Sequence, residues 1–354
     1  MTLRFILTGS LAVAACVATI SAQSPAAKGP AAPSTSAKPA AKNYVPAKTA
    51  WGDPDLQGTY TNKDESGIPF ERPSEFDGKS NADVDDKELA ELIADRAQQA
   101  LDRAPGVGGI DTGAGPTHWY ENYGAKNSRA WMVTDPADGK IPALSAEGQR
   151  RAAIAAAARR GNGFDVGPFD GPEDLSLYDR CISRGIPGSM MPAIYGNSYE
   201  IVQSPGWVAI RYEMVHETRL IPLDGRPHVD ARITSYMGDA RAHFEGNTLV
   251  VETTNFKAQS TYRGASEHLK LIEHFTPVSG KAVLWSVTLD DPHTWTRPWT
   301  FAMNLTKDNS QPIFEYGCHE GNYGLRDILS AARTAEKNGT STTPGTSRGR
   351  AGEE

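Results

Sequence analysis

The stretch Asp239-Ala-Arg-Ala-His-Phe-Glu-Gly-Asn-Thr-Leu-Val-Val-Glu-Thr-Thr-Asn-Phe256 decides the fold class of this chain. It contains two strand-like runs, Ala240–Glu245 and Thr248–Asn255, separated by the turn-forming pair Gly246-Asn247. A two-residue connection that contains glycine between two such runs is typical of a β-hairpin. The stretch therefore predicts two adjacent antiparallel strands.

Strand-like runs continue on both sides of this hairpin, from Tyr195 onwards. They are Ser198–Gln203, Trp207–Met214, His216–Pro222, Leu269–Thr276, Ala282–Leu289, Thr300–Leu305 and Ile313–Tyr316. Successive short runs with turns between them predict a mainly β fold, an antiparallel β-barrel or a strongly curved sheet, because closure removes exposed strand edges. Leu325–Ala335 then predicts a C-terminal helix that packs across one end of the sheet.

The part of the chain that precedes the predicted sheet is more heterogeneous. Asp83–Arg103 has leucine and isoleucine at helical spacings and aspartates near its start, where they interact favourably with the helix dipole. A second helix is expected to begin at Ser145, whose hydroxyl can cap the alanine-rich turns that follow. We therefore expect an irregular, partly helical N-terminal extension.

The sequence divides into five parts of different composition. We expect a signal peptide over 1–22, a disordered Ala/Pro-rich leader over 23–48, the extension over 49–178, an antiparallel β domain with its terminal helix over 179–337, and a disordered tail over 338–354. The leader and the tail are poor in large apolar residues, so burial cannot offset the entropic cost of ordering their backbone.

The N-terminus has the layout of an export signal, with Arg4, an apolar run from Phe5 to Ile20 and a small residue at Ala22. The run is shorter than the roughly 20 residues that span a bilayer, so no membrane span is expected. Val13-Ala-Ala-Cys16 resembles a bacterial lipobox, which leaves a lipid anchor at Cys16 as a less favoured alternative. The expected location is the periplasm or the extracellular medium.

Removal of the signal leaves two cysteines, Cys181 and Cys318. In an oxidising compartment an even pair most simply forms a disulfide. The bond would close a loop of roughly 140 residues, for which chain-entropy models give about 4–5 kcal/mol of stabilisation. The alternative is a thiolate site, since His319 and Glu320 directly follow Cys318.

Charge and motifs narrow the class of partner. The chain has 36 basic and 43 acidic residues, a net charge of −7, and no basic block, so no nucleic-acid partner is expected. It has no nucleophile elbow between a strand and a helix, no P-loop and no dinucleotide fingerprint opening a helix, so no nucleotide cofactor is expected. Its histidines show no metal-ligand spacing, so no metal is expected. The expected partner is a small-molecule ligand or substrate.

The strongest candidate for catalysis lies within the opening stretch. Arg241, His243 and Glu245 sit two residues apart, and alternate side chains of a strand share one face. We expect His243 to act as a general acid or base, oriented by Glu245 or by Glu213, while Arg241 or Arg226 stabilises developing negative charge. His216, from a neighbouring run, could join them. The alternative is that this face is simply solvated.

Other residues are candidates for substrate binding. Arg226 and His228 lie at a turn after a strand-like run, where binding residues often occur, although Arg226 could equally satisfy local backbone groups. Trp295 and Trp299 flank a loop-like Arg-Pro pair, and exposed tryptophans at a barrel mouth would suit an apolar or sugar-like ligand. The alternative is that both tryptophans belong to the core.

Several longer motifs carry a resemblance to a known family. They are Trp51-Gly-Asp-Pro-Asp-Leu-Gln-Gly58, Asp135-Pro-Ala-Asp-Gly-Lys-Ile-Pro142, Asp179-Arg-Cys181, Leu223-Asp-Gly-Arg-Pro-His228, Phe244-Glu-Gly-Asn-Thr-Leu-Val-Val-Glu-Thr-Thr-Asn-Phe256 and Cys318-His-Glu-Gly-Asn-Tyr323. Over most of the mature chain the sequence resembles an uncharacterised family of exported acidobacterial and proteobacterial proteins. The resemblance implies no reaction. The β-rich half is also loosely similar to lipocalin-type barrels, a likeness of fold.

These observations leave three hypotheses about function. The first is a cofactor-independent enzyme of lyase, hydratase or isomerase type that acts on a small organic molecule through His243. The second is a non-catalytic, lipocalin-like binding protein, in which the same polar groups orient a ligand in a mostly apolar cavity. The third is a surface-anchored interaction module, which would require lipidation of Cys16. An enzyme should place His243 towards the cavity, whereas a carrier should have an apolar and aromatic lumen.

Overall fold

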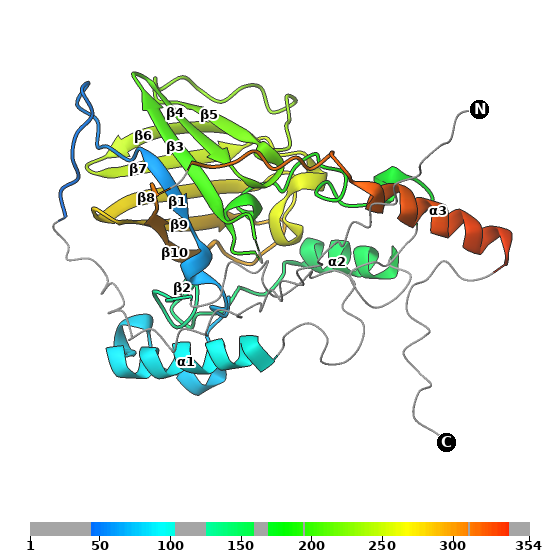
Figure 1. Ribbon diagram of the computed structural model, residues 1–354, viewed down its shortest axis with the longest axis horizontal. Helices are drawn as coiled ribbons and strands as arrows, with labels where there is room; N and C mark the ends of the chain where they lie inside the picture. Colours follow the sequence, from blue (N-terminus) through cyan, green and yellow to red (C-terminus); the bar gives the residue numbers. More distant parts are fainter. Residues whose placement is uncertain (1–43, 103–124, 159–168, 194, 311, 340–354) are drawn as a thin grey trace, which may run out of the picture. The chain divides into compact units, whose positions relative to one another are not determined.

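The computed structural model describes residues 44–102, 125–158, 169–193, 195–310 and 312–339 (Figure 1). The predicted signal peptide and most of the predicted leader and tail lie outside these described residues. In the described part of the chain no helix is long and apolar enough to cross a membrane.

The described strands form one antiparallel sheet that curves into a nearly closed barrel. Along the sheet the order is β5-β4-β3-β1-β10-β9-β8-β7-β6, and β2 pairs with β10 beside this path. The strands are β1 (Gly58–Thr61), β2 (Val133–Asp135), β3 (Ser198–Ser204), β4 (Trp207–Tyr212), β5 (Thr218–Pro222), β6 (Asp239–Glu245), β7 (Thr248–Thr254), β8 (Lys270–Ser279), β9 (Ala282–Asp290) and β10 (Trp299–Lys307). The predicted fold class is therefore confirmed.

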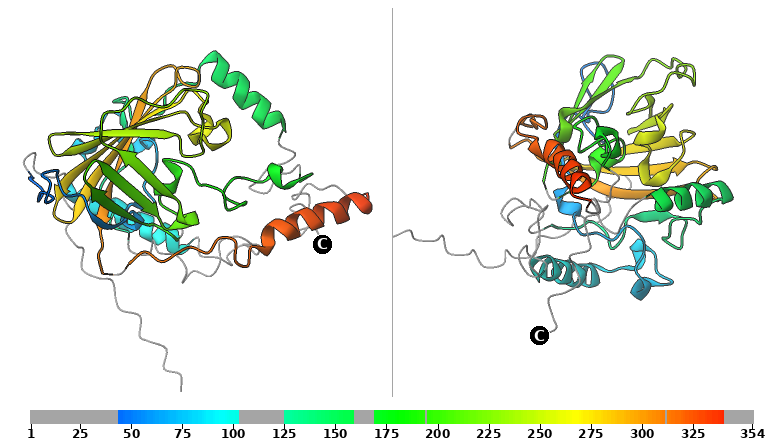
Figure 2. Two further views of the ribbon diagram at one scale, coloured as in Figure 1. Left: turned by 90° about the horizontal axis from the view of Figure 1, so that it is seen from above. Right: turned by 90° about the vertical axis from the view of Figure 1, so that its right-hand side faces the viewer.

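The two ends of this path, β5 and β6, approach each other without forming a ladder of backbone hydrogen bonds. Figures 1 and 2 show the sheet curling until these two strands lie side by side. The predicted run Ile313–Tyr316 is not a strand: it is an extended segment that crosses the outside of β3 and β4, where Arg211 Nη2 donates to the carbonyl oxygen of Ile313 at 3.4 Å.

Three helices are described: α1 (Asp86–Asp102), α2 (Ala146–Ala158) and α3 (Tyr323–Lys337). The predicted cap of α2 is confirmed, because Ser145 Oγ accepts a hydrogen bond from the Gly148 amide at 3.0 Å. The apolar side of α3 packs on Phe169 and Leu175 of the extension. Within the described residues α3 therefore does not pack across the barrel end as predicted.

The inside of the barrel is filled by apolar and aromatic side chains. Burial alternates along β8 and β9, so every second residue points inward. Trp285 meets Phe301 edge-on at 5.7 Å between ring centroids and lies 6.3 Å from Phe275. All three side chains are fully buried. Packing of large rings on one another gives the barrel a solid hydrophobic centre.

One ion pair lies inside this apolar centre. Arg219 on β5 contacts Glu273 on β8 through two hydrogen bonds, of 2.7 and 3.2 Å, and both side chains are buried. Arg219 also donates to Thr253 and Tyr212, and the Trp285 indole donates to Glu273 at 3.2 Å. Burial alone would lower the pKa of Arg219, but Glu273 and Tyr212 outweigh burial and raise it.

We predict that Arg219→Met destabilises the protein by about 3–5 kcal/mol, because it leaves the Glu273 carboxylate buried without its counter-charge. Arg211→Met is the matched control, since Arg211 pairs with Glu200 at 3.0 Å on the partly exposed outside of the barrel. That variant should lose less than about 1 kcal/mol. Urea denaturation measures both, and equal losses would refute the role given to the buried pair.

A second buried carboxylate lies where β1 ends. Glu65 Oε2 accepts hydrogen bonds from the hydroxyl and the amide of Ser128, at 2.7 and 3.3 Å. Burial raises the pKa of Glu65, although Ser128 and Arg129 oppose that rise. Nearby, the hydroxyl of Tyr199 is buried and has no hydrogen-bond partner among the described residues. Burial, and after it the charge of Glu65, raise the pKa of Tyr199.

The raised pKa of Glu65 predicts a pH-dependent effect of Glu65→Gln. The folded state holds this proton more tightly than the unfolded chain, whose pKa is near 4.5. The contribution of Glu65 to stability is therefore complete below that value and is lost as the pH rises through the folded pKa. The variant should become progressively more stable relative to wild type between about pH 4 and 8. Urea denaturation across this range measures the effect, with the exposed Glu267→Gln as the control, whose difference from wild type should not change with pH. A difference for Glu65→Gln that is also independent of pH would contradict the prediction.

Candidate functional site

The predicted catalytic residues of β6 lie on the outside of the barrel. Arg241, His243 and Glu245 share one face, as predicted, while the buried Ala242 points inward. His243 Nε2 lies 3.0 Å from Glu245 Oε1, and the two side chains are 62 % and 64 % exposed. The imidazole is thus placed beside a carboxylate, but in water and facing away from the interior of the barrel.

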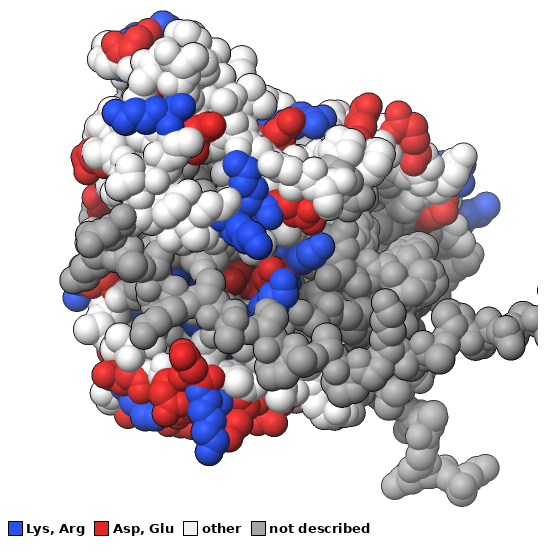
Figure 3. All heavy atoms as spheres, turned by 60° about the vertical axis from the view of Figure 1, so that its left-hand side comes forward, with Lys and Arg blue, Asp and Glu red and all other residues white. Residues whose placement is uncertain are grey.

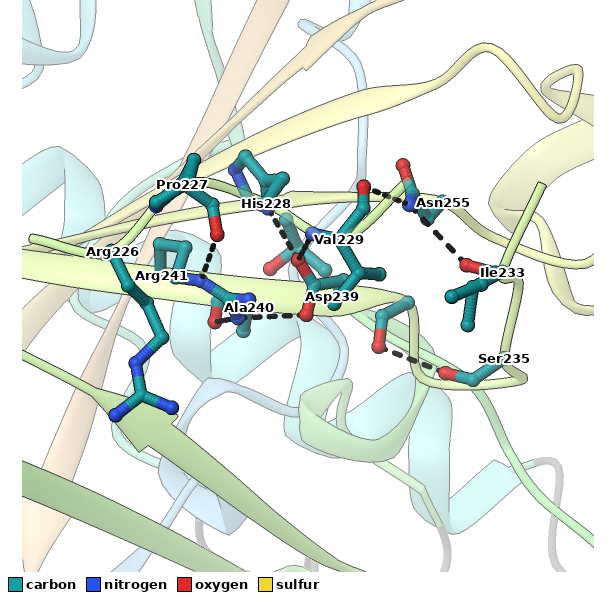
Figure 4. A network of polar contacts seen from close by, with 12 residues as sticks. Arg226, Pro227, His228, Val229, Ile233, Ser235, Asp239, Ala240, Arg241 and Asn255 are labelled. Atoms are coloured by element: carbon teal, nitrogen blue, oxygen red, sulfur yellow. Dashed lines mark hydrogen bonds and ion pairs between the residues drawn. The ribbon is translucent and has the colours of Figure 1, made fainter. Parts of the chain in front are cut away.

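A more ordered polar network surrounds Asp239, at the start of β6 (Figure 4). Asp239 Oδ2 lies 2.7 Å from His228 Nδ1 and accepts from the Val229 amide, while Oδ1 accepts from Arg241 Nη1 at 2.7 Å. His228 Nε2 in turn lies 3.5 Å from Glu252 on β7. Both ring nitrogens of His228 therefore face carboxylates. Arg241 and His228 were predicted to act at a site, and here they join a loop to the sheet.

The loop in question connects β5 to β6 and covers residues 223–238. Asn255 fastens it, because Nδ2 donates to the carbonyl oxygens of Val229, Asp230 and Ile233 at 3.2–3.3 Å (Figure 4). Arg241 Nε donates to the carbonyl of Pro227 at 3.1 Å. Asn255 itself has a left-handed backbone, with φ of 58°, a conformation that asparagine tolerates better than most residues.

We predict that Asn255→Ala and Asn255→Gly both release this loop. Each removes the side-chain hydrogen bonds, while glycine keeps the left-handed backbone unstrained and alanine does not. Amide hydrogen exchange over residues 229–236 should become at least about 10-fold faster, and faster in the alanine variant than in the glycine variant. Asn247→Ala, in the β6–β7 turn, is the control. Unchanged exchange in both Asn255 variants would show that the loop is held by other contacts.

The remaining predicted binding residues have different environments. Arg226 is exposed, pairs with Asp224 through Nε at 2.7 and 2.8 Å, and lies 5.3 Å from the Trp207 ring. Trp295 and Trp299 are buried, 3 % and 0 % exposed, and pack edge-on at 5.4 Å. The expectation that these tryptophans are exposed at the barrel mouth is wrong, because their large apolar rings gain more by joining the core.

Glu213 and His216 lie in the turn between β4 and β5, and they do not meet His243. Glu213 Oε2 accepts from the Ser198 amide at 3.1 Å, and His216 Nδ1 lies 3.0 Å from the Tyr316 carbonyl oxygen. Val215 and His216 are left-handed, with φ of 62° and 47°. Positive φ is rare for a β-branched residue, and such strain concentrates at functional sites. This turn is therefore a candidate site.

A cavity of about 160 Å³ opens on one side of the β4–β5 turn. Its lining is mostly polar and consists of Thr59, Lys63, Ser198, Glu213, Asp308, Pro312, Ile313 and Phe314. Lys63 Nζ lies 4.0 Å from Asp308 Oδ2. Glu213, predicted as a catalytic residue, thus lines a small polar hollow formed with the extended segment that follows β10.

Three tyrosines lie around Arg184 on the other side of the turn. We call Tyr178, Tyr195 and Tyr316 the tyrosine cluster. The rings of Tyr195 and Tyr316 stack at 6.3 Å, the three hydroxyls hydrogen-bond to one another, and the Arg184 guanidinium lies 5.3 Å from the centre of the Tyr178 ring. Arg184 Nη1 is buried and has no hydrogen-bond partner among the described residues.

Burial shifts the titration of this group in a consistent direction. It lowers the pKa of Arg184, because removal from water disfavours the charged form, and it raises the pKa of Tyr178 and Tyr316. In Tyr195 the hydrogen bond to Tyr316 is the largest cause of a raised pKa, ahead of burial. The three phenols therefore stay neutral, and they provide no negative charge to compensate the guanidinium.

The disulfide predicted between Cys181 and Cys318 is present. It joins two segments that each contribute to the tyrosine cluster, since Tyr178 precedes Cys181 by three residues and Tyr316 precedes Cys318 by two. Ser183 Oγ adds a hydrogen bond to Glu217 at 2.9 Å, which ties the first segment to the β5 side. The alternative of a thiolate site at Cys318 is therefore excluded while this bond is formed.

Arg184 and the tyrosine cluster were missed at the level of sequence. The available signal was proximity to the predicted disulfide, because a bond between Cys181 and Cys318 must bring their neighbours together. Glu273 was missed too. It occupies an inward position between Leu271 and Phe275, and a carboxylate at such a position requires a buried partner.

Within the described ranges, no group of three or more histidine, cysteine or carboxylate side chains is arranged to hold a metal ion. Acidic and basic side chains lie next to each other on the face of the molecule drawn in Figure 3. The described part of that face thus carries charges of both signs.

Comparison with known proteins adds little to this description. No protein-family model and no curated protein matches the chain. Among solved structures, the chain is similar to an abundant heat soluble (SAHS) protein from Ramazzottius varieornatus, with 13 % identity over 38 % of this chain and 87 % of that chain and a TM-score of 0.23.

Proposed function

We propose that this protein is an exported, non-catalytic binding protein that holds a small, largely apolar molecule between the inward-facing side chains of its barrel, which move apart to admit it. The observation that carries the proposal is the division of residues between the two faces of the sheet. Most inward positions are apolar or aromatic, as at Leu271, Phe275 and Trp285, whereas the predicted acid/base residue His243 lies outside. An apolar lining with few polar groups is characteristic of small-molecule sites.

Buried polar atoms without partners provide the contacts that would orient such a ligand. Within the described residues these include the Tyr199 hydroxyl and Trp299 Nε1. Both side chains are on inward positions of their strands and are fully buried. Because a buried polar atom without a partner is costly, a ligand that supplies the missing hydrogen bond gains affinity at that point.

Export forms part of the same proposal. A disulfide between Cys181 and Cys318 is expected in an oxidising compartment and is rare in a reducing one. The apolar N-terminal run has the layout of a signal peptide, and it lies outside the described residues. A periplasmic or secreted protein fits both features. The surface-anchored alternative would require lipidation of Cys16.

A second candidate function, an acid/base enzyme, keeps one supporting observation. The 3.0 Å contact between His243 and Glu245 is the arrangement in which a carboxylate orients an imidazole. Its high exposure argues against the dry, shaped site in which such chemistry is efficient. The two functions differ in whether a captured molecule is released unchanged.

The test uses purified mature protein incubated with a metabolite extract, followed by mass spectrometry of the retained and the converted molecules. Wild type and His243→Ala should retain the same molecule unchanged. Tyr199→Phe should reduce its retention about 5-fold, which corresponds to one hydrogen bond of about 1 kcal/mol. Tyr323→Phe removes the hydroxyl of an exposed tyrosine on α3 and is the matched control.

Two outcomes would contradict the proposal. Conversion of a metabolite that disappears in His243→Ala would establish the enzyme instead. Binding would lie outside the barrel if two results occurred together. Wild type and Tyr199→Phe would retain the ligand equally, and the ligand would protect no buried residue from hydrogen exchange.

A further inference from the structure

The partly buried Arg184 differs from the buried Arg219 in what its guanidinium contacts. Arg219 is matched by the carboxylate of Glu273 at 2.7 Å. Among the described residues no carboxylate forms an ion pair with Arg184, and Nη1 is buried without a hydrogen bond. A charge that is partly withdrawn from water and has no counter-charge is unfavourable, so a group that supplies the missing negative charge would stabilise it.

The carboxylate of Glu217, which contacts the backbone of Arg184, does not fill that role. Glu217 Oε2 accepts from the Ser183 hydroxyl at 2.9 Å and from the backbone amide of Arg184 at 3.4 Å. It therefore positions the backbone of Arg184 and leaves the guanidinium free to face the tyrosine cluster. On the cluster side, phenol hydroxyls are the groups presented.

The donors around Arg184 suit a particular chemistry. A guanidinium offers several N–H donors in a planar fork that matches the oxygens of a carboxylate or phosphate. The Tyr178 hydroxyl donates to Met214 Sδ at 3.3 Å, and the hydroxyls of the tyrosine cluster also contact one another. Each can turn its proton to an oxygen placed between them. The disulfide holds both halves of this donor set in place.

We propose that Arg184 and the tyrosine cluster form a binding site for an oxyanion, the carboxylate or phosphate group of a small ligand. The site is distinct from the barrel interior and does not depend on the binding function proposed above. It lies beside the strained β4–β5 turn, where the backbone oxygen of Tyr316 contacts His216. The predicted binding residue His216 thus adjoins this site and not the β6 face.

The test measures the thermal midpoint of the full mature protein with benzoate, with inorganic phosphate and with sodium chloride at the same ionic strength. A bound anion stabilises the folded state and raises the midpoint in a saturable way. We expect benzoate or phosphate, but not chloride, to do so. A response to benzoate alone assigns a carboxylate ligand, and a response to phosphate alone assigns a phosphate ligand. No response to either anion overturns the proposal.

Substitutions test whether the anion that raises the thermal midpoint binds at Arg184 and the tyrosine cluster. Arg184→Gln should weaken anion affinity at least 10-fold, and Arg184→Lys should retain part of it because the charge remains without the fork. Tyr195→Phe and Tyr316→Phe should each weaken it about 5-fold. Arg226→Gln is the matched control, since Arg226 also lies over an aromatic ring but is exposed and paired with Asp224. An equal loss in this control would mean that anions bind non-specifically.

A measurement on the wild-type protein covers the case in which Arg184→Gln does not fold. Phenylglyoxal modifies accessible arginines, and peptide mass spectrometry reports the rate at each one. The effective anion should slow modification of Arg184 in proportion to its occupancy while leaving Arg226 unaffected. A rate at Arg184 that does not change with saturating anion overturns the proposal. Retention of this protection in Tyr199→Phe separates the site from the barrel interior.

Discussion

Closure of the barrel depends on one buried ion pair. The backbone ladder runs continuously from β5 round to β6 but does not join these two strands. Arg219 reaches from β5 into the interior, where it contacts Glu273 on β8 and Thr253 on β7. Side-chain hydrogen bonds thus connect the two sides of the seam that backbone hydrogen bonds leave open. Such a pair gains stability from each further donor and acceptor that is matched. Tyr212 and Trp285 match two of them, whereas Arg219 Nε has no hydrogen-bond partner among the described residues.

The same physical rule separates structural charges from a candidate binding charge. Burial disfavours the charged form of both Arg219 and Arg184. In Arg219 the charge of Glu273 helps to outweigh burial, and the pKa is raised, whereas in Arg184 burial dominates and the pKa is lowered. The first residue has its counter-charge within the fold. The second has phenols, which remain neutral. A cation that the fold leaves uncompensated is a stronger indication of a ligand than a polar residue whose partners are all present, such as Asp239.

The sequence predicted the features that follow from local pattern. Alternation and turns predicted the antiparallel barrel, and an even cysteine pair predicted the disulfide. Alternation also indicates which face of β6 is exposed: Ala240, Ala242 and Phe244 are apolar, so the opposite face, with His243, should point to solvent. Tertiary contacts decided the rest. Trp295 lies in a loop-like stretch, but an isolated β-bridge to Leu144 holds this stretch against the rest of the protein, and the side chain is buried. Arg184 and Tyr316 are far apart in the sequence, and the disulfide brings their segments together.

The position of Arg184 explains how a site can exist beside a barrel whose interior is packed. A sheet with rings packed at 5.7 Å has little freedom to change shape around a charge. The segments that carry Tyr178 and Tyr316 lie outside the sheet, and they are held by the disulfide, by Glu217 and by the turn at His216. Among the described residues, none of these contacts pairs a carboxylate with the Arg184 guanidinium, because Glu217 accepts from the Arg184 backbone amide and the Ser183 hydroxyl. These contacts therefore order an electropositive site on segments outside the sheet, while the barrel supplies rigidity. Binding residues commonly lie on such connecting segments, supported by a stable scaffold.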